Sequence, residues 1–183
     1  MKAVVGALAA CIGVFVAFLL QQALPAVHVL HGARFVLVPM IFCYAAMALP
    51  FPAMLFTALF TGLLTDLMYL HIVGGRVEIA LGCSIVFFVI YGSIANGLRP
   101  SYLRGHWWPV IPLSIIGTWA FLFMQFAMIS LRREGLVFDQ AILWRILAPG
   151  LLAGLFVPLL HAVVRPFAGL IPENPWQRTT RAY

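Results

Sequence analysis

The chain has 183 residues, of which 64% are hydrophobic and 9% charged, and its formal net charge is +6. Soluble domains are about 45–50% apolar and about 25% charged, and a chain of this length buries only about 70% of its surface on folding. The excess apolar surface needs lipid against it, which excludes an ordinary soluble domain. The charge comes from Lys2 and ten arginines scattered between apolar runs. Nucleic-acid binding requires a basic cluster on a soluble face, so we expect these side chains to contact membrane lipid and no nucleic acid.

Six apolar segments are candidates for helices that cross a hydrocarbon core of about 30 Å, which takes about 20 residues. We expect these spans over residues 3–24, 35–49, 53–73, 79–97, 110–131 and 141–164. The first is longer than the apolar part of a signal peptide, about 7–15 residues, so we interpret it as a retained span. Pro50 and Pro52 break the chain between the second and third spans, because proline lacks a donor and restricts the residue before it. The sequence predicts an all-α integral membrane protein, with about six transmembrane helices in one bundle and a single domain over residues 1–183.

The connection over residues 98–108 combines arginine, tyrosine and tryptophan, a composition typical of the headgroup layer of a membrane. If the N-terminus is inside, slightly more basic residues lie on the inner side than on the outer side. The positive-inside rule then favours both termini in the cytoplasm.

Asp66 is the only carboxylate within an apolar span. A charged aspartate at the bilayer centre costs about 2.5–3.5 kcal/mol, so such residues usually face the bundle and are often functional. Thr57, Thr61 and Thr65 precede it at a spacing of four residues and therefore share one helix face. With Gly62 they make this helix small and polar on one side. Such a face is typical of helix packing in membranes, and it also fits a ligand or partner site.

Gly150 and Gly154 form a G-x-x-x-G pair in the last span, and this spacing permits two helices to approach closely. We interpret the pair first as internal helix packing and second as a contact between copies of the chain.

Catalytic and metal-binding arrangements are not expected. Ser93 and His161 invite comparison with intramembrane serine proteases, but Ser93 lacks the second glycine of a G-x-S-G motif, and catalysis needs serine and base within hydrogen-bond reach. The other histidines flank spans rather than cluster, so we expect no metal and no cofactor. The three cysteines each lie inside an apolar run and are interpreted as packing residues: Cys11, Cys43 and Cys83.

A short pattern surrounds the third span. Leu49-Pro50-Phe51-Pro52 precedes it, Gly62-Leu63-Leu64-Thr65-Asp66-Leu67 lies late in it, and Gly74-Gly75 follows ahead of an apolar helix. Over residues 34–97 this pattern resembles the rod shape-determining MreD family. That family is recognised by a G-L-x-x-D-type stretch late in an apolar span, followed by a short loop with glycine.

The resemblance implies a non-enzymatic component of the bacterial inner membrane that serves cell elongation, cell shape and peptidoglycan synthesis. It implies binding to MreC and, through the wider complex, association with the MreB filament and the RodA–transpeptidase pair. The family fold is thought to be similar to the six-helix substrate-binding components of vitamin transporters. A partner-binding or polar bundle face is expected at Asp66, Thr65, Gly62 and Thr61, with the adjoining loop set by Gly74 and Gly75.

A second hypothesis is a small-molecule transporter component of the vitamin-binding type. It predicts a deep pocket between helices, lined by Asp66, threonines and aromatic side chains. A ligand that co-purifies with the protein would separate this hypothesis from the scaffold.

Overall fold

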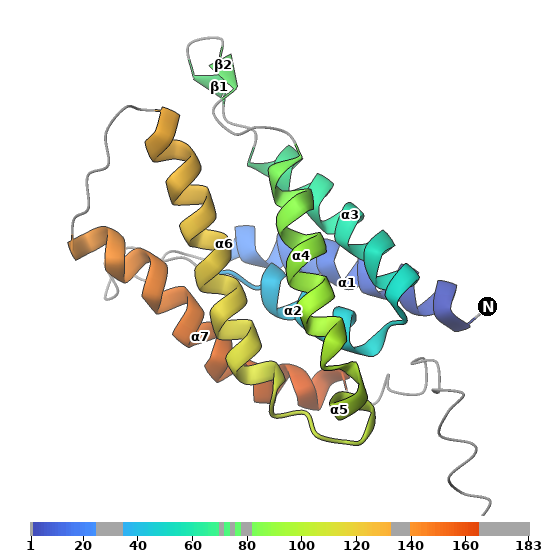
Figure 1. Ribbon diagram of the computed structural model, residues 1–183. Coiled ribbons are helices and arrows are strands. Elements are labelled where there is room, and N and C mark those ends of the chain that lie inside the picture. The colour runs from blue at the N-terminus through green and yellow to red at the C-terminus, as the bar shows by residue number, and fades with distance from the viewer. Residues whose placement is uncertain are drawn as a thin grey trace, which may run out of the picture.

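The computed structural model describes residues 2–24, 35–69, 72–73, 76–77, 82–132 and 140–164. Apart from turns and connections, the described residues form helices and two short strands, β1 and β2, which pair antiparallel (Figure 1). In chain order the elements are α1 (Lys2–Ala23), α2 (Val38–Ala48), α3 (Phe51–Met68), β1 (Ile72–Val73), β2 (Arg76–Val77), α4 (Cys83–Gly97), α5 (Arg99–Leu103), α6 (Val110–Arg132) and α7 (Gln140–Val164).

Four of these helices are long and apolar enough to cross a membrane. They cover Ala3–Ala23, Phe51–Met68, Val110–Leu131 and Ile142–Ala162. Their outer faces expose large apolar side chains, among them Ile12 at 64% and Leu155 at 73%. Exposed apolar surface on this scale marks contact with a membrane or another protein. The structure therefore agrees with an α-helical membrane protein, in which α2 and α4 are apolar but shorter than the other four helices.

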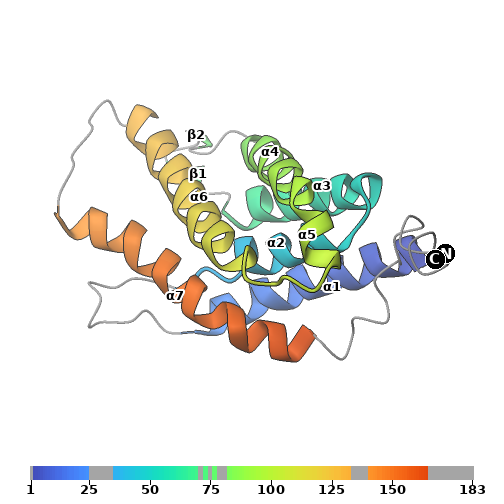
Figure 2. The ribbon, with the colours of Figure 1, turned by 60° about the horizontal axis from the view of Figure 1, so that its bottom comes forward.

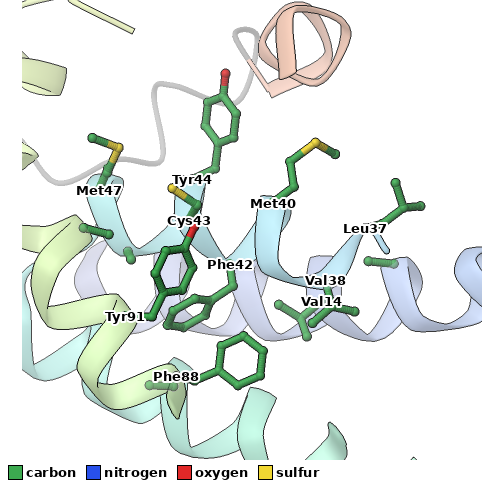
Figure 3. Packing of buried hydrophobic residues seen from close by; sticks show 14 of the residues in the cluster. Val14, Leu37, Val38, Met40, Phe42, Cys43, Tyr44, Met47, Phe88 and Tyr91 are labelled. Atoms are coloured by element: carbon green, nitrogen blue, oxygen red, sulfur yellow. The ribbon is translucent and has the colours of Figure 1, made fainter. Parts of the chain in front are cut away.

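The short helix α2 lies in the middle of the bundle and is buried along most of its length. It packs against α1, α3, α4 and α6. Figure 3 shows Phe42 of α2 directed toward Phe88 and Tyr91 of α4, and the rings of Phe42 and Phe88 meet edge to face at 5.0 Å between centroids. Phe42, Cys43 and Met47 have no exposed surface. A helix that is apolar on all sides is expected in such a position.

The break between α2 and α3 falls at the prolines, as the sequence predicts. Leu49 and Pro50 are both extended, with ψ of 151° and 153°, and Pro50 is the N-cap of α3. Pro50 has no N–H to donate to the carbonyl of Ala46, four residues earlier. The side-chain amide of Asn96 on α4 donates to that carbonyl at 2.7 Å and to the carbonyl of Leu49 at 2.8 Å.

The helix bounds differ from the predicted spans mainly between α3 and α4. The third span is predicted to run to residue 73, whereas α3 ends at Met68 and Ile72–Val73 form β1, with Ile72 opposite Val77. Short apolar runs with β-branched residues do not distinguish helix from strand. The fourth span is predicted from residue 79, and α4 begins at Cys83. In the connection over residues 98–108 the structure adds the short helix α5.

The helices α6 and α7 lie side by side and form a pair at one side of the bundle (Figures 1 and 2). Gly150 of α7 leaves the space that the indole of Trp119 fills, and Gly154 leaves the space filled by Ile115. The indole N–H of Trp119 also donates to the carbonyl of Leu147 at 3.0 Å. Both glycines of the G-x-x-x-G pair thus lie at a contact between two helices of the same chain.

Candidate functional site

Asp66 lies in the last turn of α3 and is only 2% exposed. Its carboxylate faces the N-terminus of α4. Oδ2 accepts a hydrogen bond from the backbone N–H of Gly82 at 2.6 Å, and Oδ1 accepts one from the N–H of Ser84 at 3.3 Å. Asp66 thereby connects two helices that are adjacent in the chain.

The first N–H groups of any α-helix lack partners within the helix, and they carry a partial positive charge. In α4 the N-cap is Gly82, at φ of +100°, a left-handed conformation that glycine adopts without strain. Glycine has no side chain with which to cap the helix, so the carboxylate of Asp66 takes that role from α3. The two N–H donors and the helix dipole in turn stabilise a buried carboxylate that would otherwise be costly in an apolar bundle.

The threonine row lies on the buried side of the same helix. Thr57, Thr61 and Thr65 have no exposed surface. Their hydroxyls donate to the carbonyls four residues earlier, at 3.0, 2.7 and 2.7 Å. These hydroxyls therefore satisfy their hydrogen bonds within α3, and the row serves as a small, compact packing surface.

Gly62 sets how closely α3 approaches α4. A Cβ atom at this position would lie 2.6 Å from the backbone nitrogen of Ile85 and would also meet its Cα. Gly62, Thr61, Thr65 and Asp66 thus lie together on the inner side of α3, where all four residues are buried. Gly74 and Gly75 lie outside the described residues.

A second polar junction includes Tyr69, three residues after Asp66, and the sequence analysis does not identify it. The side chain of Gln21, near the end of α1, donates to the hydroxyl of Tyr69 at 2.9 Å. Its carbonyl oxygen accepts from the N–H of Leu37 at 3.0 Å. Tyr69 is the C-cap of α3 and Leu37 the N-cap of α2, so one amide joins the ends of three helices. A glutamine near the end of an apolar span is the signal that identifies such a junction.

The opposite end of the bundle holds His161. Its ring stacks on Trp107 at 4.9 Å between centroids and lies 6.1 Å from the ring of Tyr44. Ser93, the other residue of the protease comparison, is exposed on α4, and its hydroxyl donates to the carbonyl of Val89 at 2.7 Å. Within the described segments the partners of His161 are therefore aromatic rings, and the hydroxyl of Ser93 is bonded to its own helix.

No group of three or more histidine, cysteine or acidic side chains suited to a metal ion occurs in the part of the chain that the structure describes. The three cysteines are free thiols; Cys11 and Cys43 are buried, and Cys83 is partly exposed.

Comparison with known proteins identifies no relative of this chain. No model of a known protein family matches the chain, and searches of the curated proteins and of the solved structures also return no match.

Proposed function

We propose that this chain is a non-enzymatic scaffold of the bacterial cell-elongation complex, of the rod shape-determining MreD type. In this proposal it has six spans in the inner membrane, with both termini in the cytoplasm. It binds MreC and, through the wider complex, associates with MreB, RodA and the transpeptidase. It contributes to cell shape by holding these proteins together and not by chemistry of its own.

The observation that supports the proposal is that the buried carboxylate of Asp66 joins α3 to α4. The family-like stretch from Gly62 to Asp66 contributes to the contact between α3 and α4, and the carboxylate is hydrogen-bonded to two backbone N–H groups at the start of α4. A general acid or base must reach the proton that it transfers. Asp66 is buried, and both its oxygens accept hydrogen bonds from α4. Its position therefore suits a residue that holds α3 and α4 together.

Because the polar side of α3 is turned inward, its outer side is the surface available to a partner. Leu59, Leu63 and Leu67 lie there at a spacing of four residues and are 50%, 48% and 54% exposed. Residues at this spacing form one row on a helix. We place a transmembrane helix of MreC against this row. The hydrogen bonds of Asp66 to the start of α4 fix the rotation of α3 and thereby keep the row on the outer side of the bundle.

The transporter hypothesis requires Asp66 and the threonines to line a pocket. In the structure the three threonine hydroxyls are fully buried and bonded to carbonyls of α3. These groups are therefore not free to bind a ligand in this conformation, which favours the scaffold.

The proposal is tested by affinity purification of the tagged full chain from native membranes, together with cross-linking. A photoreactive residue at Leu63 or Leu67 is expected to cross-link to MreC, whereas the same residue at Leu155 on α7 is not. Asp66→Ala is expected to reduce the recovery of MreC, while Ser93→Ala, an exposed change on α4, leaves it unchanged.

Recovery of MreC equally from wild type and Asp66→Ala, with cross-links only at Leu155, would show that the partner surface has been assigned to the wrong helix. Absence of any elongation protein, together with a bound small molecule in the purified sample, would instead favour the transporter hypothesis.

A further inference from the structure

Two arginines lie at the end of the bundle formed by α5 and the connection to α6, and no carboxylate of the described residues lies beside them. Arg99 lies at the start of α5, and Arg104 and His106 follow it with exposed side chains. Asp66 is the only carboxylate side chain in the segments that the structure describes. Asp66 accepts its hydrogen bonds at the N-terminus of α4, whereas α5 follows the C-terminus of α4, so Asp66 lies at the other end of this helix (Figure 1).

Arg99 differs from Arg104 because it is partly buried. Its Nε atom is enclosed and has no hydrogen-bond partner among the described residues. Burial lowers the pKa of Arg99, because desolvation disfavours the charged form, yet a guanidinium remains protonated in proteins. The enclosed Nε is out of reach of a ligand, so the two terminal nitrogens of the guanidinium, which bond to no described residue, are the donors left for an acceptor from outside the described residues.

The chain on either side of Arg99 has the composition of the headgroup layer of a membrane. Tyr102, three residues further along α5, meets the ring of Tyr44 edge to face at 6.2 Å between centroids. Trp108 is 61% exposed and Leu98 is 39% exposed. Tryptophan, tyrosine and arginine together are enriched where acyl chains meet headgroups.

We propose that Arg99 is the anchor of a binding site for the phosphate of an anionic phospholipid. A guanidinium binds phosphate through two parallel hydrogen bonds, which a diffuse positive surface does not provide. Arg104 adds only a general, salt-screened attraction for an anionic membrane. The exposed Trp108 and Leu98 contact the acyl chains, so the ligand is a lipid and not free phosphate. This inference does not depend on the function proposed above.

The test uses the purified full chain in detergent. Its thermal unfolding midpoint is measured with added phosphatidylglycerol, with phosphatidylcholine and with inorganic phosphate, and retained lipid is counted by native mass spectrometry. Phosphatidylglycerol is expected to raise the midpoint and to remain bound, while the other two have little effect. Arg99→Gln is expected to weaken retention about tenfold, because the charge-assisted hydrogen bonds to the phosphate are lost. Arg104→Gln, the matched control, is expected to weaken it less than about twofold.

Equal losses in Arg99→Gln and Arg104→Gln would overturn the site in favour of diffuse attraction. Equal stabilisation by phosphatidylcholine, or full stabilisation by inorganic phosphate, would overturn the choice of ligand. If Arg99→Gln does not fold, Arg99→Lys keeps the charge without the planar fork. Arg99→Lys is expected to lose most of the retention, and wild-type retention in this variant would refute the assignment.

Discussion

At the residue scale, the position of Asp66 explains why a carboxylate is tolerated inside an apolar bundle. Two backbone N–H groups at the start of α4 donate to its two oxygens. The same contact supplies α4 with a cap that Gly82 cannot provide. A buried group of this kind is costly to remove, because its partners are left without acceptors.

We expect Asp66→Ala to destabilise the protein by about 1–3 kcal/mol, since the N–H groups of Gly82 and Ser84 then lack an acceptor. Asp66→Asn is expected to cost about half as much, because one amide oxygen still accepts a hydrogen bond. Thermal unfolding in detergent measures both. Leu67→Ala, at a side chain that is 54% exposed, is the control and should change little. Unchanged stability in Asp66→Ala would show that the cap is dispensable.

Gly62 gives a second prediction at this scale. Gly62→Ala is expected to destabilise by about 1–3 kcal/mol, because the added methyl group meets the backbone of Ile85, which cannot move away without shifting α4. Gly97→Ala, at a helical position with nothing within 4 Å of the added Cβ, is the matched control. It should be neutral or slightly stabilising. The thermal unfolding midpoints of the two variants test this expectation. Equal midpoints would contradict the close approach of α3 and α4.

At the scale of elements, side chains of one helix donate hydrogen bonds to backbone carbonyls of another. Pro50 leaves the carbonyl of Ala46 without its usual donor, and Asn96 of α4 supplies one. Trp119 of α6 donates to the carbonyl of Leu147 in α7 and so links these two helices. Irregular backbone is tolerated at membrane depth only where neighbouring groups satisfy it.

We therefore expect Asn96→Ala to destabilise the protein by about 1–2 kcal/mol, because two hydrogen bonds are lost and each contributes about 0.6–2 kcal/mol between membrane helices. The carbonyls of Ala46 and Leu49 lose their donor in this variant. Ser93→Ala on the same helix removes only an exposed hydroxyl bonded to its own helix, and it should have a smaller effect. Denaturation of the two variants in the same detergent provides the comparison, and a larger loss in Ser93→Ala would contradict it.

At the scale of the whole molecule, the short helices raise the question of how many segments cross the membrane. A helix of 15 residues such as α4 is about 22 Å long, less than a hydrocarbon core of about 30 Å. The still shorter α2 is enclosed by other helices. Its length therefore does not have to match the thickness of the lipid around the protein.

Six crossings and four crossings predict different exposure of the α3–α4 connection. With six, Arg76→Cys lies on the periplasmic side of the inner membrane and reacts with a maleimide that cannot cross this membrane, while His106→Cys reacts only after the membrane is permeabilised. With α2 and α4 not crossing, both positions lie on the same side. We expect the six-span pattern in a background with the native cysteines replaced by alanine, and identical labelling at the two positions would refute it. The replaced residues are Cys11, Cys43 and Cys83.

Much of the helical architecture follows from hydrophobicity and helix breakers alone. The sequence locates the long apolar helices, the break at Pro50 and the inward face of α3, because lipid and proline act on each segment independently of its neighbours. It does not predict that the third helix stops at Met68, since a short apolar run fits a helix or a strand equally well. It also does not predict the role of Gln21, whose partners are distant in the sequence.

The sequence by itself determined that this chain needs lipid, where its main apolar helices lie, and that Asp66 requires compensation. Only the tertiary structure decided how that compensation is made: by the N-terminus of α4, which Gly62 allows to come close. Hydrophobicity is a property of each segment, and composition reveals it. Hydrogen bonds between helices depend on which backbone groups are left without partners and on which side chain the packing brings to them.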